Sequence, residues 1–250
     1  RKVLGWTSAR WAGKPPWEAG HEGQSTRRWP GQQPNARTPV SQDNPLLNLA
    51  LVGLTAYVFA IWLGDLRRTR AGVTPDPRAF PGAATCSWLA VGIAVAGALV
   101  LLGIETAGEN ALGVSGEQSN ITALYLPVMV AAAFGEELVF RGYLVVTGRG
   151  RTLFIASVIG FSVVFALGHP FLWAWKSPAD GQPNQLLFDF SLKAWWSTGI
   201  VFVFSLWLYT MRFWRKNPKH SILPCIAAHL AKNLGVFVIK LAQGHMSGWW

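Results

Sequence analysis

The sequence predicts an all-α fold, a polytopic membrane helix bundle of about six transmembrane helices with a disordered N-terminal tail. Only 14% of the 250 residues are charged and 51% are hydrophobic, whereas a typical soluble domain is about 25% charged. Apolar runs of roughly 20 residues, the length that crosses a bilayer, recur from Pro45 onward. The two cysteines lie inside such runs, which excludes a disulfide-built domain and a multi-cysteine zinc module.

Residues 1–44 differ in composition from the rest of the chain and are predicted to form a disordered basic tail. They contain Gly, Pro, Gln, Ser and Arg without any period, and their tryptophans are scattered singly. Such a segment buries too little apolar surface to offset the entropy lost on ordering. Residues 45–250 are therefore predicted to form the transmembrane domain.

Six apolar segments in that domain are predicted to cross the membrane, in chain order. They are residues 45–64, 84–104, 121–146, 152–175, 187–211 and 221–243. The first, second and fifth are uniformly apolar, whereas polar and ionisable residues interrupt the other three. An ionisable side chain in the hydrocarbon region costs about 2.5–3.5 kcal/mol on insertion scales, so these interruptions mark candidate functional residues.

Basic loops alternate with loops poor in basic residues. The loops after the first, third and fifth segments carry Arg67, Arg68, Arg70, Arg78, Arg149, Arg151, Arg212, Arg215, Lys216 and Lys219. By the positive-inside rule these loops face the cytoplasm, which places residue 45 and the C-terminus on the outer side. The arginines of the tail would then be exported, against the same rule. The net charge of +10 thus orients a membrane protein and indicates no nucleic-acid partner.

The third segment contains three ionisable residues, Glu136, Glu137 and Arg141. Glu137 and Arg141 are spaced i and i+4, with the acid N-terminal, which is the favoured orientation for an ion pair on one helix face. Glu136 points about 100° away from Glu137 and has no cation at i+4. We therefore expect Glu137 to be structural and Glu136 to be available as a base.

Two further segments contain imidazoles. His169 precedes Pro170, which biases it away from helical angles, and Phe165 lies one turn before it. His229 and Asn233 are spaced i and i+4, so both present polar groups to one side of a helix. Read separately, His169 fits an interfacial residue, and the His229–Asn233 pair fits an interhelical hydrogen bond. Lys232 points elsewhere and has no predicted role.

Read together, these residues supply the groups needed for hydrolysis of an amide by water. Glu136 is a base that can activate water, and the imidazoles and the carboxamide can hold that water or stabilise the oxyanion. No serine or cysteine motif for a covalent nucleophile accompanies them.

Three spaced motifs resemble those of the CPBP (CAAX protease and bacteriocin-processing) intramembrane proteases, which are related to the Rce1-type CAAX prenyl endopeptidase. The E-E-x-x-x-R motif is matched from Glu136 to Arg141, F-x-x-x-H from Phe165 to His169, and H-x-x-x-N/D from His229 to Asn233. The motifs stand in the family's order, and the resemblance covers about residues 84–243. Fuller family members have eight spans, two more than predicted here.

The resemblance implies a helical membrane fold with a conical cavity open to the cytoplasm. It also implies that Glu136 activates water held by His169, that His229 and Asn233 stabilise the oxyanion, and that Glu137 and Arg141 order the site. A zinc site formed by Glu136, His169 and His229 is the alternative. We favour the metal-free mechanism, with no cofactor, because the resemblance to the CAAX enzymes implies it.

The sequence thus predicts an intramembrane endopeptidase, multi-pass in a bacterial cell membrane, with its catalytic cavity facing the cytoplasm. Its expected substrate is a peptide or a prenylated, CAAX-type protein, and its other partner is the lipid bilayer. One alternative is a non-proteolytic protein of the same fold, such as a bacteriocin-immunity protein or a scaffold, but a scaffold needs no buried base. A proton-coupled transporter is the other alternative, but the chain shows no repeated halves.

Overall fold

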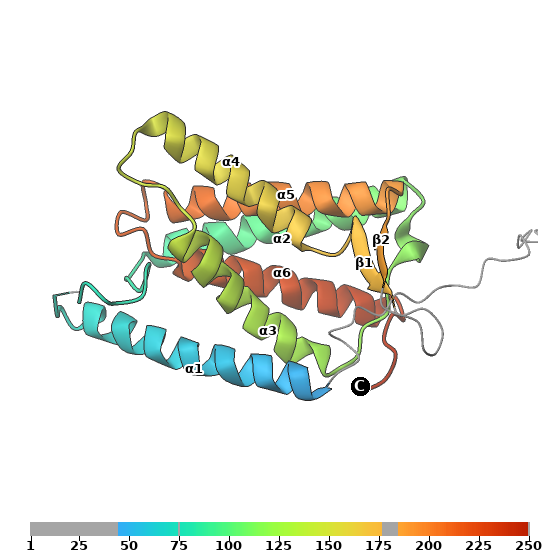
Figure 1. Ribbon diagram of the computed structural model, residues 1–250, viewed down its shortest axis with the longest axis horizontal. Coiled ribbons are helices and arrows are strands. Elements are labelled where there is room, and N and C mark those ends of the chain that lie inside the picture. The colour runs from blue at the N-terminus through green and yellow to red at the C-terminus, as the bar shows by residue number, and fades with distance from the viewer. Residues whose placement is uncertain (1–44, 75, 177–184, 250) are drawn as a thin grey trace, which may run out of the picture. The chain divides into compact units, whose positions relative to one another are not determined.

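The computed structural model describes residues 45–74, 76–176 and 185–249, and within these ranges the fold is almost entirely helical (Figure 1). The long helices are α1 (Pro45–Arg70), α2 (Trp88–Ala111), α3 (Tyr125–Glu136), α4 (Arg151–Gly168), α5 (Leu192–Arg212) and α6 (Leu223–Ala242). Between α2 and α3 lies a short 3₁₀ turn, η2 (Ser115–Glu117), and α3 continues directly as the π-helix η3 (Glu137–Tyr143). The predicted tail, residues 1–44, lies outside the described residues.

Five of these helices, α1, α2, α4, α5 and α6, are long and apolar enough to cross a membrane. The remaining predicted segment, 121–146, is built as α3 followed by η3 and is helical only from Tyr125 to Tyr143. Large apolar side chains are exposed along α1, α2 and α4, as expected for helices that face lipid. The prediction of an all-α polytopic membrane bundle is confirmed.

Helix α6 is the centre of the bundle, because it contacts α2, α3 and α5 (Figure 1). Helix α4 packs on α5, and α1 reaches the bundle through α3. The helices α3, α4 and α6 carry the three sequence motifs. Their arrangement around α5 and α6 therefore decides which motif residues meet.

Helices α2 and α5 approach closely because two glycines of α2 lie under tryptophans of α5. A Cβ atom at Gly97 would lie 2.2 Å from the ring of Trp207, and one at Gly108 would lie 2.0 Å from the ring of Trp196. Each indole N–H donates to a backbone carbonyl of α2, Trp207 to Ala94 and Trp196 to Glu105. Small residues at helix contacts are typical of membrane bundles, and here they fix the distance between α2 and α5.

The ends of the fourth and fifth predicted segments were wrong. We predicted 152–175 and 187–211, but α4 ends at Gly168, α5 begins at Leu192, and an antiparallel hairpin of β1 (Trp173–Lys176) and β2 (Gln185–Phe188) lies between them. His169 has extended backbone angles, φ −80° and ψ 131°, as expected before a proline. The aromatic residues that follow favour strands, and their hydropathy resembles that of a membrane helix. Hydropathy alone therefore placed the boundaries too far into the hairpin.

Candidate active site

The first motif lies where α3 changes to the wider η3 turn. Such π-turns occur often at functional sites, because they leave backbone carbonyls that other groups must satisfy. The hydroxyl of Tyr209, on α5, lies 2.7 Å from the carbonyl oxygen of Phe140 and 2.9 Å from that of Leu144. Tyr209 thereby ties the end of η3 to α5.

Glu137 and Arg141 form the predicted ion pair, and both side chains are completely buried. Nη1 of Arg141 donates to Oε1 of Glu137 at 3.0 Å. Nη2 of Arg141 donates to the hydroxyl of Ser205 at 2.7 Å, and that hydroxyl donates to Ser162 on α4 at 2.9 Å. The guanidinium of Arg141 therefore connects η3 with α5 and, through Ser205, with α4.

His229 joins this pair from α6. Its Nδ1 lies 2.8 Å from Oε1 of Glu137. Because a carboxylate only accepts, Nδ1 carries the proton in this bond, which leaves Nε2 to face Glu136 at 3.9 Å. Glu137 thus orients the imidazole so that its second nitrogen points toward the other acid.

Glu136 differs from Glu137 in exposure and in partners. Its side chain is 34% exposed, whereas that of Glu137 is 0% exposed. Oε2 of Glu136 is buried but has no hydrogen-bond partner among the described residues. The two adjacent acids therefore differ as the helix geometry predicted. Glu137 is paired inside the bundle, and Glu136 is accessible.

Phe165 connects the second motif, at the end of α4, with the rest of the site. Its ring lies 4.3 Å from the guanidinium carbon of Arg141, and its centroid is 4.8 Å from that of His169 and 6.1 Å from that of His229. Nδ1 of His169 lies 2.8 Å from the carbonyl oxygen of Phe165, so the proton sits on Nδ1 and Nε2 is free to accept. His169 also lies within electrostatic range of Glu136 and His229.

Asn233, the last motif residue, reaches α3. Its side-chain amide donates to the carbonyl oxygen of Met129 at 2.9 Å. A carboxamide has two N–H groups, so one donor remains after this bond. His229 and Asn233 therefore both extend from α6 toward the α3–η3 segment, as their shared helix face predicted.

Lys232, which had no predicted role, forms an ion pair between α6 and α2. Its Nζ lies 2.8 Å from Oε2 of Glu105 and 5.4 Å from the centroid of the Phe204 ring. The same ring meets His229 edge-on at 5.4 Å between centroids. Lys232 thus holds α6 to α2 one helical turn beyond His229.

The donors of the zinc alternative do not form a ligand set. No group of three His, Cys, Asp or Glu side chains among the described residues lies close enough together to hold a metal ion. We therefore derive no step through a metal ion, and the zinc alternative stays a prediction that metal removal tests.

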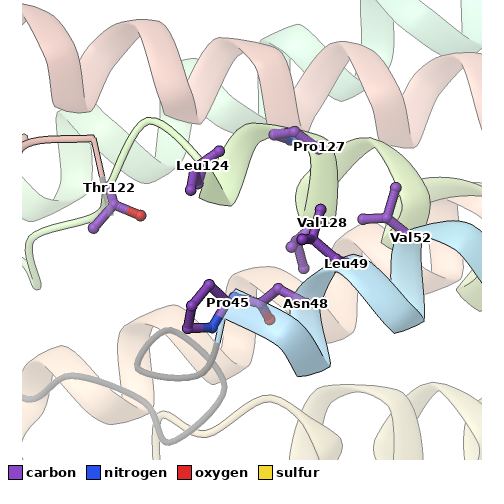
Figure 2. Close-up of a pocket in the computed structure, with 8 residues that line it drawn as sticks. All are labelled: Pro45, Asn48, Leu49, Val52, Thr122, Leu124, Pro127 and Val128. Carbon is purple, nitrogen blue, oxygen red and sulfur yellow. The ribbon is translucent and has the colours of Figure 1, made fainter.

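A small pocket lies away from the motif residues, between the beginnings of α1 and α3 (Figure 2). Its lining consists of Pro45, Asn48, Leu49, Val52, Thr122, Leu124, Pro127 and Val128. No motif residue belongs to this lining. The pocket is mainly apolar and offers no acid or base for catalysis.

Sequence reasoning missed the residues that support Arg141 and the η3 turn, namely Ser162, Ser205 and Tyr209. Each is a polar residue inside an apolar helix, and small polar side chains in membrane helices commonly bond across to a neighbour. A polar residue within an apolar segment can be recognised in the sequence, but the sequence does not identify the neighbour to which it bonds. The contacts of these residues with η3 depend on how α4 and α5 pack.

Comparison with protein families supports the motif reading. Residues 118–235 match the family model of the type II CAAX prenyl endopeptidase Rce1-like proteins. Comparisons with curated proteins and with solved structures found no match. The match spans all three motifs, from α3 to α6, and confirms the predicted resemblance for this part of the chain.

Proposed function

We propose that this chain, Rce1-like over residues 118–235, is an intramembrane endopeptidase that hydrolyses a peptide bond with water activated by Glu136. The observation that carries the proposal is the contrast between the two adjacent acids. Glu137 is buried and bonded to Arg141 and His229, whereas Glu136 is 34% exposed and has no cation of its own. A base must be free to take a proton, and of the two acids only Glu136 meets that condition.

The proposed reaction begins with a water molecule between Glu136 and His169. Glu136 takes one proton from the water, and Nε2 of His169 accepts a hydrogen bond from the other hydrogen. The water oxygen bonds to the carbonyl carbon of the substrate, which turns the carbonyl oxygen into an oxyanion. Glu136 then returns the proton to the amide nitrogen, the C–N bond breaks, and a carboxylic acid and an amine leave.

His229 and Asn233 are proposed to stabilise the oxyanion. Asn233 retains one N–H after its bond to Met129, and Nε2 of His229 donates while the ring carries both protons. Glu137 and Arg141 keep the imidazole of His229 in place. Hydrogen-bond donors of this kind contribute most when they are held in position before the reaction.

The proposed substrate is a peptide or a CAAX-type lipidated protein, and the proposed setting is a bacterial cell membrane. The basic loops are proposed to face the cytoplasm, with the catalytic cavity open to that side. Water activation is proposed to need no metal, because Glu136 itself can serve as the base. The family match over residues 118–235 supports the proposed substrate class, and the carboxylate of Glu136, which has no cation of its own, supports the proposed role as the base.

The proposal is tested with the purified full chain in detergent or vesicles and a library of quenched fluorescent peptides, including farnesylated CAAX peptides. We expect cleavage by the wild type, and a loss of about 10²–10⁴-fold in kcat for Glu136→Gln. Glu117→Gln is the matched control, since Glu117 is exposed and lies in η2, and it should cleave like the wild type. Equal cleavage by Glu136→Gln would remove Glu136 from the mechanism, and a wild type that cleaves no peptide would favour the non-proteolytic alternative.

A further inference from the structure

The β1–β2 hairpin begins directly after the candidate active site and is attached to it. The ring of Phe171 stacks on His169, with centroids 5.9 Å apart and planes 14° apart. The indole of Trp173 donates to the carbonyl oxygen of Leu167 at 2.7 Å. Leu172, between them, is buried. The first strand therefore has a fixed position relative to His169.

Among the described residues, one backbone edge of β1 has no partner strand. Trp173 pairs with Phe188, Ala174 with Leu187, and Trp175 with Leu186. The next pair in this register is Leu172 and Asp189. The N–H of Asp189 donates to the carbonyl oxygen of Leu172 at 2.9 Å, so Leu172 and Asp189 form a hydrogen-bonded pair.

Hydrogen-bonded and non-hydrogen-bonded pairs alternate along an antiparallel ladder. Ala174 therefore directs its backbone groups to β2, whereas Trp173 and Trp175 direct theirs outward. The sheet formed by the described residues has two strands, and β1 has no second neighbour within it.

An unpaired edge of this kind is costly in an apolar setting. The side chains of Trp175, Leu186 and Phe188 are large, apolar and exposed. Backbone N–H and C=O groups that lack both water and a partner are strongly unfavourable in a bilayer, and a third strand would satisfy them. A two-stranded hairpin is also only marginally stable by itself.

We propose that the free edge of β1 binds the peptide substrate as a third, extended strand, which brings the bond to be cleaved to Glu136 and His169. Because α4 runs from the basic loop at Arg151 to Gly168, β1 lies at the end of α4 away from the side on which the cavity is proposed to open, so the paired substrate residues are those that extend past the cleaved bond toward that end. This inference rests on the proposed protease function and adds the binding mode of its substrate. Backbone pairing on an exposed edge is an established way to recognise an extended peptide. It also suits the chemistry, because hydrolysis needs an accessible amide and an extended strand presents one.

The edge of β1 is favoured over that of β2 because β1 leads directly from His169. All four residues of β2 are exposed, whereas Trp173 and Ala174 of β1 are half-buried against the fold. A strand rises about 3.3 Å per residue. Because Trp173 follows His169 by four positions, the paired substrate residues should lie within about four residues of the cleaved bond.

The first test uses the peptide that the wild type cleaves best, with one backbone amide at a time N-methylated. N-methylation removes one donor, and we expect about a tenfold loss of kcat/KM at sensitive positions. Sensitive positions should alternate with insensitive ones, two residues apart, because only every second residue of a strand faces its neighbour. Uniform tolerance, or losses without alternation, would overturn the strand model while leaving the protease function standing.

The second test uses proline to remove one N–H from each free edge. Trp175→Pro should raise KM with little change in kcat, while Leu186→Pro, the directly paired residue on β2, should leave KM unchanged. Trp175→Leu separates the loss of the indole from the loss of the N–H, and thermal unfolding in detergent shows that each variant folds. Equal effects of the two proline variants on KM would contradict the assignment of the substrate-binding edge to β1. If Trp175→Pro does not fold, the N-methylated peptides alone test whether the substrate binds as a strand. If the wild type cleaves no peptide at all, the proposed protease function fails first.

Discussion

Two groups of buried charges lie in this bundle, and they differ in how their charges are balanced. Where α2 meets α6 and the beginning of α5, each acid has its own cation. Glu105 pairs with Lys232 at 2.8 Å, and Glu109 pairs with Lys193 and accepts from Gln118. This group contains at least as many cations as acids.

The motif group on η3 and α6 is balanced differently. Of the two acids, Arg141 bonds to Glu137 alone, and the imidazole of His229 lies between Glu137, at 2.8 Å, and Glu136, at 3.9 Å. Oε2 of each acid and Nε of Arg141 have no hydrogen-bond partner among the described residues. One-to-one pairs hold helices together, whereas a surplus carboxylate costs free energy and is expected where chemistry uses it.

The largest effect is expected for Arg141→Leu. It leaves Glu137 as an uncompensated buried charge and removes the bonds to Ser205, so we expect a loss of about 3–5 kcal/mol in stability. Thermal unfolding in detergent measures this loss, and activity should disappear with the fold. Arg141→Lys keeps the positive charge but loses the planar guanidinium with its several donors. Its stability should therefore lie between that of the wild type and that of Arg141→Leu. An unchanged unfolding temperature for Arg141→Leu would show that the motif pair is not structural.

A smaller effect, mainly on catalysis, is expected for Asn233→Leu. Loss of one oxyanion donor typically lowers kcat by about 10²–10³-fold. The bond to Met129 is lost as well, so the unfolding temperature should fall slightly. Steady-state kinetics should show the change in kcat and not in KM. An unchanged kcat would mean that Asn233 serves only to join α6 to α3.

The pair between α2 and α6 should affect stability more than chemistry. Lys232→Glu and Glu105→Lys should each destabilise the protein, and the double exchange should restore part of the loss. A coupling energy of about 0.5–3 kcal/mol is expected from the double-mutant cycle. If the single variants abolish turnover while the unfolding temperature stays constant, Lys232 belongs to the reactive group instead.

The smallest effect is expected from metal removal. Activity after dialysis against 1,10-phenanthroline should equal that of untreated protein, and elemental analysis should find no stoichiometric zinc. Loss of activity that zinc restores would assign Glu136, His169 and His229 to a metal site instead.

Local patterns account for the part of the fold that the sequence predicted. Long apolar runs located the membrane helices, because crossing a bilayer requires about 20 apolar residues in succession. The i and i+4 spacing predicted the Glu137–Arg141 pair and the shared face of His229 and Asn233, since helix geometry alone brings such residues together. The same geometry separated Glu136 from Glu137.

Only the tertiary structure decided which distant groups meet. Glu137 bonds to His229 across 92 positions, and Arg141 bonds to Ser205 across 64. Lys232 finds Glu105 on α2, and the hairpin replaces helix after His169. Hydropathy and spacing describe one segment at a time, whereas these contacts depend on how α2, α4, α5 and α6 pack. The sequence by itself thus determined the helices, the candidate catalytic residues and which of the two acids pairs with Arg141, and the packing decided which groups of α4, α5 and α6 surround that pair.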